Sequence, residues 1–168
     1  SRLQKIEGRS RKAQMALAEH YGLKEYPSSA GGCLLTEKLF ANKLGLLRDR
    51  GQLRDMTAIE LLKLGRHFLL PGGAKAIVGR NVSENERMRS LAANGSYFII
   101  RPIGMPGPTT LLDADAQEED IEQARRLCAA YSDKSIGRVK IRRFLKDELL
   151  DEIPTEPMER DEARPWLL

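Results

Sequence analysis

The most reactive side chain in this sequence is Cys33, which follows the glycine pair of PSSAGGCLL (residues 27–35). A thiol between a glycine-rich loop and an apolar segment could be accessible, and nearby amide donors or Lys38 could lower its pKa. A nucleophilic or sulfur-carrying thiolate needs these conditions. The alternative is that Cys33, beside Leu34 and Leu35, is a small buried hydrophobic residue.

A second set of candidate functional residues lies in GRHFLLPGGAKAIVGRNVSEN (residues 65–85). Apolar runs on either side of its PGG turn predict a β-hairpin, and Asn81 is expected to cap the following helix, with Ser83 and Glu86 at capping-box spacing. Cations would then lie close to glycine backbone and a helix N-terminus, a favourable setting for phosphate. The predicted RNA contacts in this segment are Arg66, Lys75, Arg80, Asn81 and Asn85.

Two further groups of cations share a pattern that could serve phosphate binding. GRVKIRRF (residues 137–144) predicts a strand with one basic face. The alternative for this strand is a sheet edge protected by charge. The other group lies at the start of a helix expected over residues 10–21, where the macrodipole gives no reason for cations. The alternative to phosphate contact for this group is an ordinary solvated basic face. The predicted contacts are Arg138, Lys140 and Arg142 in the strand, and Arg9, Arg11 and Lys12 at the helix.

Charge is distributed unevenly over the 168 residues, whose net charge is +4. Residues 146–168 hold three Lys/Arg against eight Asp/Glu and carry −5, whereas residues 1–145 hold 25 against 16 and carry +9. A basic body with only 5% aromatic residues favours contact with a nucleic-acid backbone over base stacking. An ordinary solvated surface is the competing interpretation.

Several classes of protein are disfavoured. Two cysteines and two histidines at no recognisable ligand spacing predict neither a disulfide framework nor a metal site. No apolar run has membrane-spanning length. Because the chain starts with Ser1 and its first residues are too charged for a secretory signal, we expect a piece of a longer cytoplasmic protein.

The sequence predicts an α+β fold to position these residues. In this fold a helical N-terminal segment precedes a small domain with a hairpin-based antiparallel sheet and packed helices. Helices are expected over residues 39–47, 57–64 (capped by Thr57), 81–93 and 117–131, and strands over residues 96–101 and 109–112. Cys128 falls on the apolar face of its helix and is expected in the core. The expected division is 1–55, 56–145 and an acidic, mobile tail over 146–168, in which Trp166 could anchor the end.

One segment resembles a known enzyme family. PSSAGGCLLTEKLFANKL (residues 27–44) resembles a loop of PP-loop tRNA thiolation enzymes, especially tRNA 2-thiouridylase, also labelled tRNA (5-methylaminomethyl-2-thiouridylate)-methyltransferase. The resemblance implies that Cys33 matches their second active-site cysteine, in enzymes that transfer persulfide sulfur to an ATP-activated tRNA uridine. Their SGGxDS nucleotide-binding loop does not occur in this sequence. ATP and Mg are therefore implied only for an upstream domain or another chain, with no cofactor in this one.

A second resemblance covers residues 65–144. The order VGRNVSEN, SYFIIR, PGPTTLL, ARRLCAAYS and a VKI strand is similar to the RNA-binding NFACT-R domain, with IVGRNVSEN (residues 77–85) as the best motif. That family includes a longer form in ribosome-associated quality-control proteins and a shorter form attached to PP-loop thiolation enzymes. SYFIIR and the PGPT turn (residues 106–109) depart from the longer form, which has a Trp-and-His-bearing strand and a PGSH-type turn, and so favour the shorter one.

Together these patterns predict the tRNA-binding, C-terminal part of an ATP-dependent tRNA uridine thiolation enzyme, a sulfurtransferase. The expected partners are tRNA, an upstream PP-loop domain and a sulfur-donor protein. Whether Cys33 is catalytic stays open. The alternative is a stand-alone RNA- or ribosome-binding module in which Cys33 is structural, and a third hypothesis is an adaptor that binds no nucleic acid.

Overall fold

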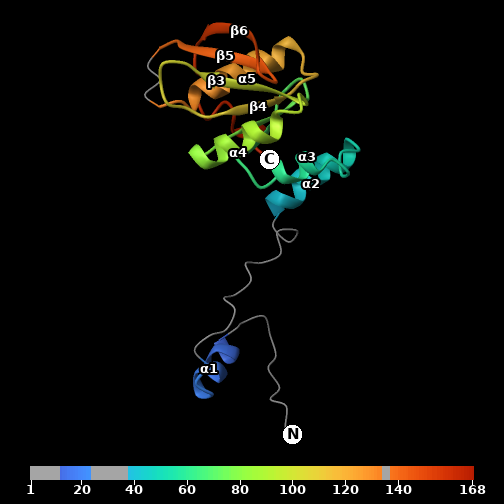
Figure 1. The fold of residues 1–168 in the computed structure, drawn as a ribbon, viewed down its shortest axis with the longest axis vertical. Helices are drawn as coiled ribbons and strands as arrows, with labels where there is room; N and C mark the ends of the chain where they lie inside the picture. Colours follow the sequence, from blue (N-terminus) through green and yellow to red (C-terminus); the bar gives the residue numbers. More distant parts are fainter. Residues whose placement is uncertain (1–11, 24–37, 134–136) are drawn as a thin grey trace. The chain divides into compact units, whose positions relative to one another are not determined.

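A six-stranded antiparallel sheet organises the larger of the two compact units into which the chain divides (Figure 1). The computed structural model describes residues 12–23, 38–133 and 137–168. The units are Ser1–Leu34 and Leu35–Leu168. The described part of the first contains helix α1 (Lys12–His20). The α+β class predicted from the sequence, with helix preceding the sheet, is confirmed.

The strands lie in the order β1-β2-β4-β3-β5-β6, and neighbouring strands are antiparallel throughout. Their bounds are β1 (Arg66–Leu69), β2 (Lys75–Val78), β3 (Tyr97–Pro102), β4 (Thr110–Asp113), β5 (Val139–Leu145) and β6 (Glu148–Thr155). The helices of this unit are α2 (Lys38–Asp49), α3 (Met56–Leu61), α4 (Val82–Ala92), α5 (Glu118–Ala130) and the short 3-10 helix η2 (Arg164–Trp166).

Helices pack on both faces of the sheet. The apolar face of α5, which includes Leu127 and Cys128, packs with Phe68, Ile100 and Ile141 in the largest core cluster. A second cluster on the opposite face joins α3 and α4 to side chains of β2, β3 and β4. A third, smaller cluster joins α2 to α3. Because helices cover both faces, β2 is buried at all four positions and shows no polar–apolar alternation.

The N-cap predicted for α4 is observed, whereas the N-cap of α3 is a different residue from the predicted one. Asn81 caps α4, as predicted, and its side chain accepts a hydrogen bond from the backbone N of Glu84. For α3 the cap is Asp55, not Thr57, because the Asp55 carboxylate accepts from the backbone N atoms of Thr57 and Ala58. The aspartate is the stronger acceptor for these free amide groups and moves the cap two residues toward the N-terminus.

The acidic segment expected to be a mobile tail belongs to the sheet. Residues 148–155 form β6 and pair with β5 along its whole length. Beyond β6, Trp166 packs against the main core cluster, as expected for an anchor, and the backbone N of Leu168 donates to the carbonyl of His67 at 2.9 Å. Backbone pairing with β5 and the ion pair of Asp151 with the buried Arg125 offset the entropy of ordering a charged segment, which composition alone does not reveal.

The expected boundary at residues 48–55 also differs from the structure. Leu47 of α2 is fully buried against Ala58 and Leu62, so that boundary would pass through a packed cluster. The division between the two units falls earlier in the chain, after Leu34.

Candidate nucleic-acid interface

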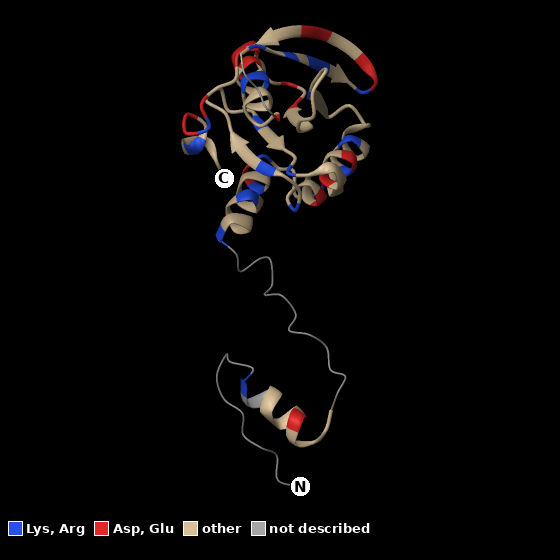
Figure 2. Cartoon of the chain, turned by 90° about the vertical axis from the view of Figure 1, so that its left-hand side faces the viewer, with Lys and Arg blue, Asp and Glu red and all other residues tan. Residues whose placement is uncertain are grey.

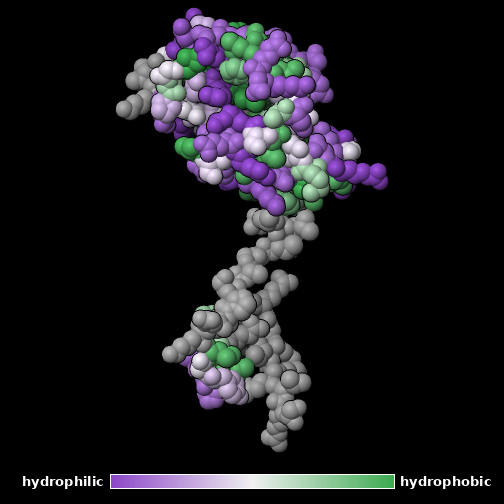
Figure 3. Space-filling model, viewed as in Figure 1, coloured by the Kyte–Doolittle hydropathy of each residue, from purple (hydrophilic) through white to green (hydrophobic). Residues whose placement is uncertain are grey.

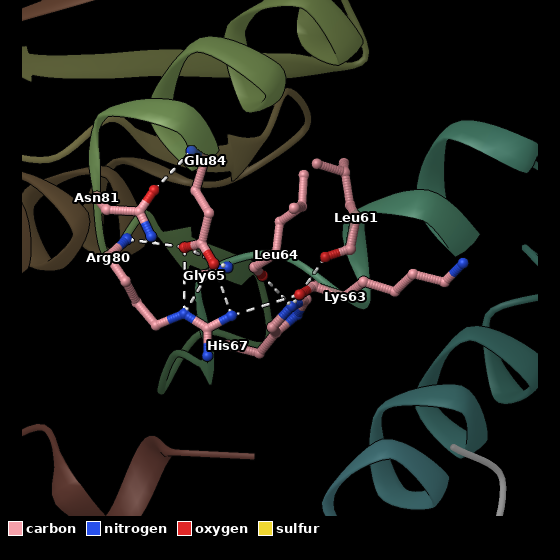
Figure 4. A network of polar contacts seen from close by, with 8 residues as sticks. All are labelled: Leu61, Lys63, Leu64, Gly65, His67, Arg80, Asn81 and Glu84. Atoms are coloured by element: carbon pink, nitrogen blue, oxygen red, sulfur yellow. Dashed lines mark hydrogen bonds and ion pairs between the residues drawn. The ribbon is translucent and has the colours of Figure 1, made fainter. Parts of the chain in front are cut away.

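The first candidate phosphate site, at the start of α4, already contains a carboxylate from the chain itself. The Glu84 Oε2 atom accepts from the backbone N of Gly65 at 3.2 Å and from the backbone N of Arg80 at 3.0 Å, while Arg80 Nη2 lies 2.7 Å from Glu84 Oε1 (Figure 4). Burial acts to raise the pKa of Glu84, but these hydrogen bonds outweigh it and lower that pKa. The helix N-terminus and its glycine neighbour are therefore satisfied internally.

The asparagines of this motif are also used by the fold. Asn81 caps α4, and Asn85 Oδ1 accepts from the backbone N of Thr109 at 2.9 Å. A Cβ added at Gly79 would lie 2.0 Å from Asn85 Oδ1, so only glycine leaves room for this contact. Because Asn81 and Asn85 bind their own chain, neither is proposed as an RNA contact. The motif holds β2, α4 and the start of β4 together.

The three cations of the segment are placed differently from one another. Lys75 is 1% exposed, so the expectation that it faces a phosphate at the surface is wrong in this structure. Its strand is covered on both faces, which the sequence pattern did not reveal. Arg66 is half-buried and lies over the Tyr131 ring, 5.0 Å from its centroid. Arg80 is exposed but held by Glu84.

The predicted basic face of β5 is observed. Val139 and Ile141 are buried in the core, whereas the side chains of Arg138, Lys140 and Arg142 are 70%, 63% and 42% exposed. The β3–β5 register adds a fourth cation, because the exposed Arg101 lies directly opposite Arg142 and therefore on the same face. We call these four residues the β5 strip. Arg101 was missed in the sequence, although a charged residue ending the apolar run SYFII was an available signal.

Carboxylates of β6 and of the residue that follows it accompany the β5 strip. The Glu152 side chain lies 2.9 Å from Arg142 Nε and 3.8 Å from Lys140 Nζ, and Glu156 lies 3.8 Å from Arg138 Nε. Figure 2 shows the blue of β5 beside the red of β6. Exposed pairs of this kind contribute little to stability, so an incoming phosphate could displace them. With four cations and two carboxylates, the strip keeps a net positive charge.

The remaining predicted residues fall at the start of the chain. Cys33, Arg9 and Arg11 lie outside the described residues, and Lys12 is the first residue of α1. Cys128 is buried in the core as predicted, and burial raises the pKa of its thiol to about 12. That thiol is therefore not a candidate nucleophile.

Within residues 12–23, 38–133 and 137–168, no group of His, Cys, Asp or Glu side chains could hold a metal ion. Across the same ranges no helix is long and apolar enough to cross a membrane. Hydrophilic side chains cover most of the face of the larger unit seen in Figure 3, and the hydrophobic ones form small separate patches.

An antiparallel sheet that presents cations from two adjacent strands defines a domain suited to a polyanion such as nucleic acid. The comparison with protein families agrees with this class. The chain belongs to the family of NFACT protein RNA binding domains, NFACT-R_2, which it matches over residues 65–167.

Among solved structures, the chain is similar to the C-terminal part of the fibronectin/fibrinogen-binding protein from Streptococcus suis (FBPS). The two share 14% sequence identity with a TM-score of 0.55, over 77% of this chain and 68% of that one. At this identity the likeness concerns the fold alone. No curated protein matches the sequence.

Proposed function

We propose that the protein binds RNA through phosphate contacts from the β5 strip. The observation that carries this proposal is the strand register, which places Arg101 of β3 opposite Arg142 and so on the same face as the exposed Lys140. Arg138, just before β5, continues the row. Lysine and arginine side chains in such a row can follow a nucleic-acid backbone without reading its sequence. Arg66 and Arg80 are secondary candidates, because each is engaged within the chain but reaches the surface.

Neutralising the β5 strip tests this proposal. Arg101→Gln, Arg138→Gln, Lys140→Gln and Arg142→Gln together are expected to weaken RNA binding at least tenfold at low salt. The slope of log affinity against log salt should also become shallower by roughly 0.7 per lost contact. Fluorescence anisotropy with labelled tRNA at several salt concentrations measures both quantities.

A control with the same change in net charge separates local contact from general electrostatics. Lys38, Arg48, Arg54 and Lys63 are all exposed and outside the strip, and their combined change to glutamine should have a clearly smaller effect. Equal losses in the two quadruple variants would contradict a specific strip. Glu152→Gln should strengthen binding, because it releases Lys140 and Arg142 without removing β6. Deleting the acidic segment would be a poor test, since it removes a strand.

The narrower hypothesis is that the RNA is a tRNA undergoing uridine thiolation with the help of Cys33. Its support is the resemblance of residues 27–44 to PP-loop thiolation enzymes, and it requires an ATP-binding PP-loop domain and a sulfur donor elsewhere. The alternative is an RNA- or ribosome-binding module in which Cys33 is structural. An adaptor that binds no nucleic acid would show no salt-dependent tRNA binding.

Cysteine reactivity distinguishes the first two alternatives. With iodoacetamide near neutral pH, Cys33 is expected to be alkylated faster than Cys128, because the buried Cys128 thiol has a pKa of about 12. Mass mapping of quenched samples gives both rates. In denaturant the two rates should become similar. If Cys33 were as slow as Cys128 in the folded protein, the catalytic assignment would be lost.

A further inference from the structure

A cavity of ≈ 670 Å³ lies at the end of the sheet where β2 and β3 begin and β4 ends. It is formed by the turn between β1 and β2, the start of β3, the loop from β4 to α5, and the residues between α2 and α3. Of the candidate binding motifs discussed above, only the glycine turn of residues 65–85 contributes to it. The cavity is large enough for a nucleobase, and its wall is made mainly of polar groups.

Two polar side-chain atoms at this cavity are buried and have no hydrogen-bond partner among the described residues. One is Nζ of Lys75, whose side chain lies 5.8 Å from the centroid of the Tyr97 ring. The other is Oε1 of Gln52, a residue that lines the cavity together with Tyr97. Burying an ammonium group without a partner is costly, and folded proteins rarely leave one so.

The charges around the Lys75 ammonium all belong to the lining of the cavity. Burial lowers the pKa of Lys75, the nearby Asp113 and Asp55 carboxylates act to raise it, and Arg50 acts to lower it. Asp113 Oδ2 accepts from the Lys75 backbone N at 2.8 Å and lies 2.6 Å from Arg50 Nη1. The Lys75 ammonium therefore lies close behind the cavity wall, although Lys75 itself does not line the cavity.

The carboxylates keep acceptor capacity for a ligand. Asp113 uses Oδ2 for its contacts, and Asp55 uses Oδ1 to cap α3. The other oxygen of each accepts no hydrogen bond from the described residues. These carboxylates would repel a phosphate. They would instead favour a ligand with two adjacent donors, and the cations Arg50 and Lys75 would favour an acceptor beside those donors.

Guanine is the RNA base that offers this pattern. Its Watson–Crick edge presents the O6 acceptor next to the N1–H and N2 amino donors, whereas adenine, cytosine and uracil each lack the pair of adjacent donors. A carboxylate can accept from both donors at once, and an ammonium or guanidinium can donate to O6. Recognition of single-stranded RNA commonly uses such contacts to an unpaired base.

The cavity is connected to the β5 strip by a further cation. Lys146 follows β5, and a Cβ added at Gly95 would lie 2.7 Å from its Cε atom. Ser96, the next residue, lines the cavity. At roughly 3.3 Å per residue, the eight residues from Arg138 to Lys146 span about 26 Å. An RNA backbone that follows the strip would therefore reach the rim of the cavity at Lys146.

We propose that this cavity receives an unpaired guanine of the RNA chain bound along the β5 strip. Asp113 or Asp55 accepts from the guanine N1–H and N2 amino groups, and Arg50 donates to O6, with the charge of Lys75 behind the wall adding to its attraction for that oxygen. The inference rests on the proposed RNA-binding function and adds base selectivity to it.

The test compares short RNAs that differ at one base. The probes are labelled UUUGUUU, UUUAUUU, UUUUUUU and UUUIUUU, where I is inosine, which keeps O6 and N1–H but lacks the N2 amino group. In anisotropy titrations the intact protein should bind the guanine heptamer about fivefold to tenfold more tightly than the uridine heptamer. Inosine should lie between them.

The variants Lys75→Met and Gln52→Leu should each reduce the guanine-to-uridine ratio to below about twofold, the first by removing the positive charge behind the cavity wall and the second by removing a polar group that lines the cavity. Lys63→Met is the matched control, since Lys63 is exposed and does not line the cavity, and it should keep the ratio of the intact protein. Lys75→Met also has a second expected result. Removing a buried ammonium without a partner should raise the Tm by about 3–6 °C, and the guanine heptamer should then stabilise this variant less than the intact protein.

The outcomes separate this inference from the function on which it rests. Equal binding of all four heptamers would overturn the guanine site and leave RNA binding intact. Failure of every heptamer to bind would overturn both. Competition by guanosine monophosphate without any preference among heptamers would assign the cavity to a free nucleotide and overturn its place on the RNA path. Retention of the guanine preference by both Lys75→Met and Gln52→Leu would remove the site from this cavity.

Discussion

Replacing Asp151 by alanine is expected to lower the free energy of unfolding by about 3 kcal/mol. Asp151 Oδ2 lies 2.9 Å from Arg125 Nη2 and 2.6 Å from Arg143 Nη2. The Arg125 side chain is only 2% exposed, and its other anionic neighbours on α5 are largely solvated. Without Asp151 a buried guanidinium loses its best-shielded partner. Urea unfolding monitored by circular dichroism measures the loss.

Asp147→Ala provides the control for this prediction. Asp147 lies in the exposed turn between β5 and β6, so its removal should change stability by no more than about 0.5 kcal/mol. Equal stabilities of the two variants would contradict the role assigned to Asp151. The double variant Arg125→Met/Asp151→Ala should recover much of the loss, because it removes the unpaired buried charge together with its partner. The same ion pairs explain how β6 is held against α5.

Acidification from pH 7 to pH 5 is expected to destabilise the protein by about 2 kcal/mol through His67 alone. The buried His67 ring lies within hydrogen-bonding distance of the carbonyls of Leu61 and Leu64 through Nε2 (Figure 4). Desolvation, together with the charges of Lys43 and Lys75, lowers the pKa of His67 from 6.5 to about 3, against the opposing effect of those carbonyls.

The direction of this pH dependence follows from the number of protons that His67 binds in the folded and unfolded states. Between pH 6.5 and about 3 the unfolded chain binds a proton at His67 that the folded protein does not, so stability rises with pH in this window and is lost as pH falls. Above pH 5 most carboxylates remain ionised, which isolates the histidine contribution. Urea unfolding at several pH values between 7 and 5 gives the slope.

Variants of the two histidines test this assignment. His67→Gln keeps an Nε2 donor for the carbonyls but does not titrate, so its stability should be nearly independent of pH between 7 and 5. The free energy of unfolding of this variant at pH 7 is expected to be lower than that of the intact protein. The comparison therefore uses the slope of that free energy against pH. His20→Gln, on the exposed end of α1, should keep the slope of the intact protein. An unchanged slope in His67→Gln would refute the assignment.

The residues of the IVGRNVSEN motif serve the fold, and the proposed RNA surface lies elsewhere. IVGRNVSEN is the most recognisable segment, yet Asn81, Asn85 and Glu84 all bind groups of their own chain. The motif is informative because its glycine and asparagines are needed for the turn between β2 and α4. The exposed cations lie on different strands, where their exact spacing is less constrained by packing.

Local interactions made much of the fold predictable. The β1–β2 hairpin, the Asn81 cap and the apolar face of α5 each depend on residues close together in sequence, so periodicity and turn composition were sufficient. The basic face of β5 was predictable for the same reason, since strand alternation separates Arg138, Lys140 and Arg142 from Val139 and Ile141.

Contacts between distant segments were not predictable in this way. The ordering of β6 depends on its pairing with β5 and on the bond from Asp151 to Arg125. The cavity depends on Arg50, Tyr97 and Asp113, which come from three separate parts of the chain. Arg101 joined the β5 strip only through the register with Arg142. Sequence patterns describe neighbours along the chain, and these arrangements are decided by neighbours in space.

The sequence by itself determined an α+β fold with a basic strand and a core position for Cys128. Only the tertiary structure decided which cations reach solvent. Lys75 was predicted to meet a phosphate at the surface, but helices cover both faces of β2 and its ammonium is buried beside Asp113. The physical reason is that burial depends on what packs over a residue, a property that its own sequence neighbours do not contain.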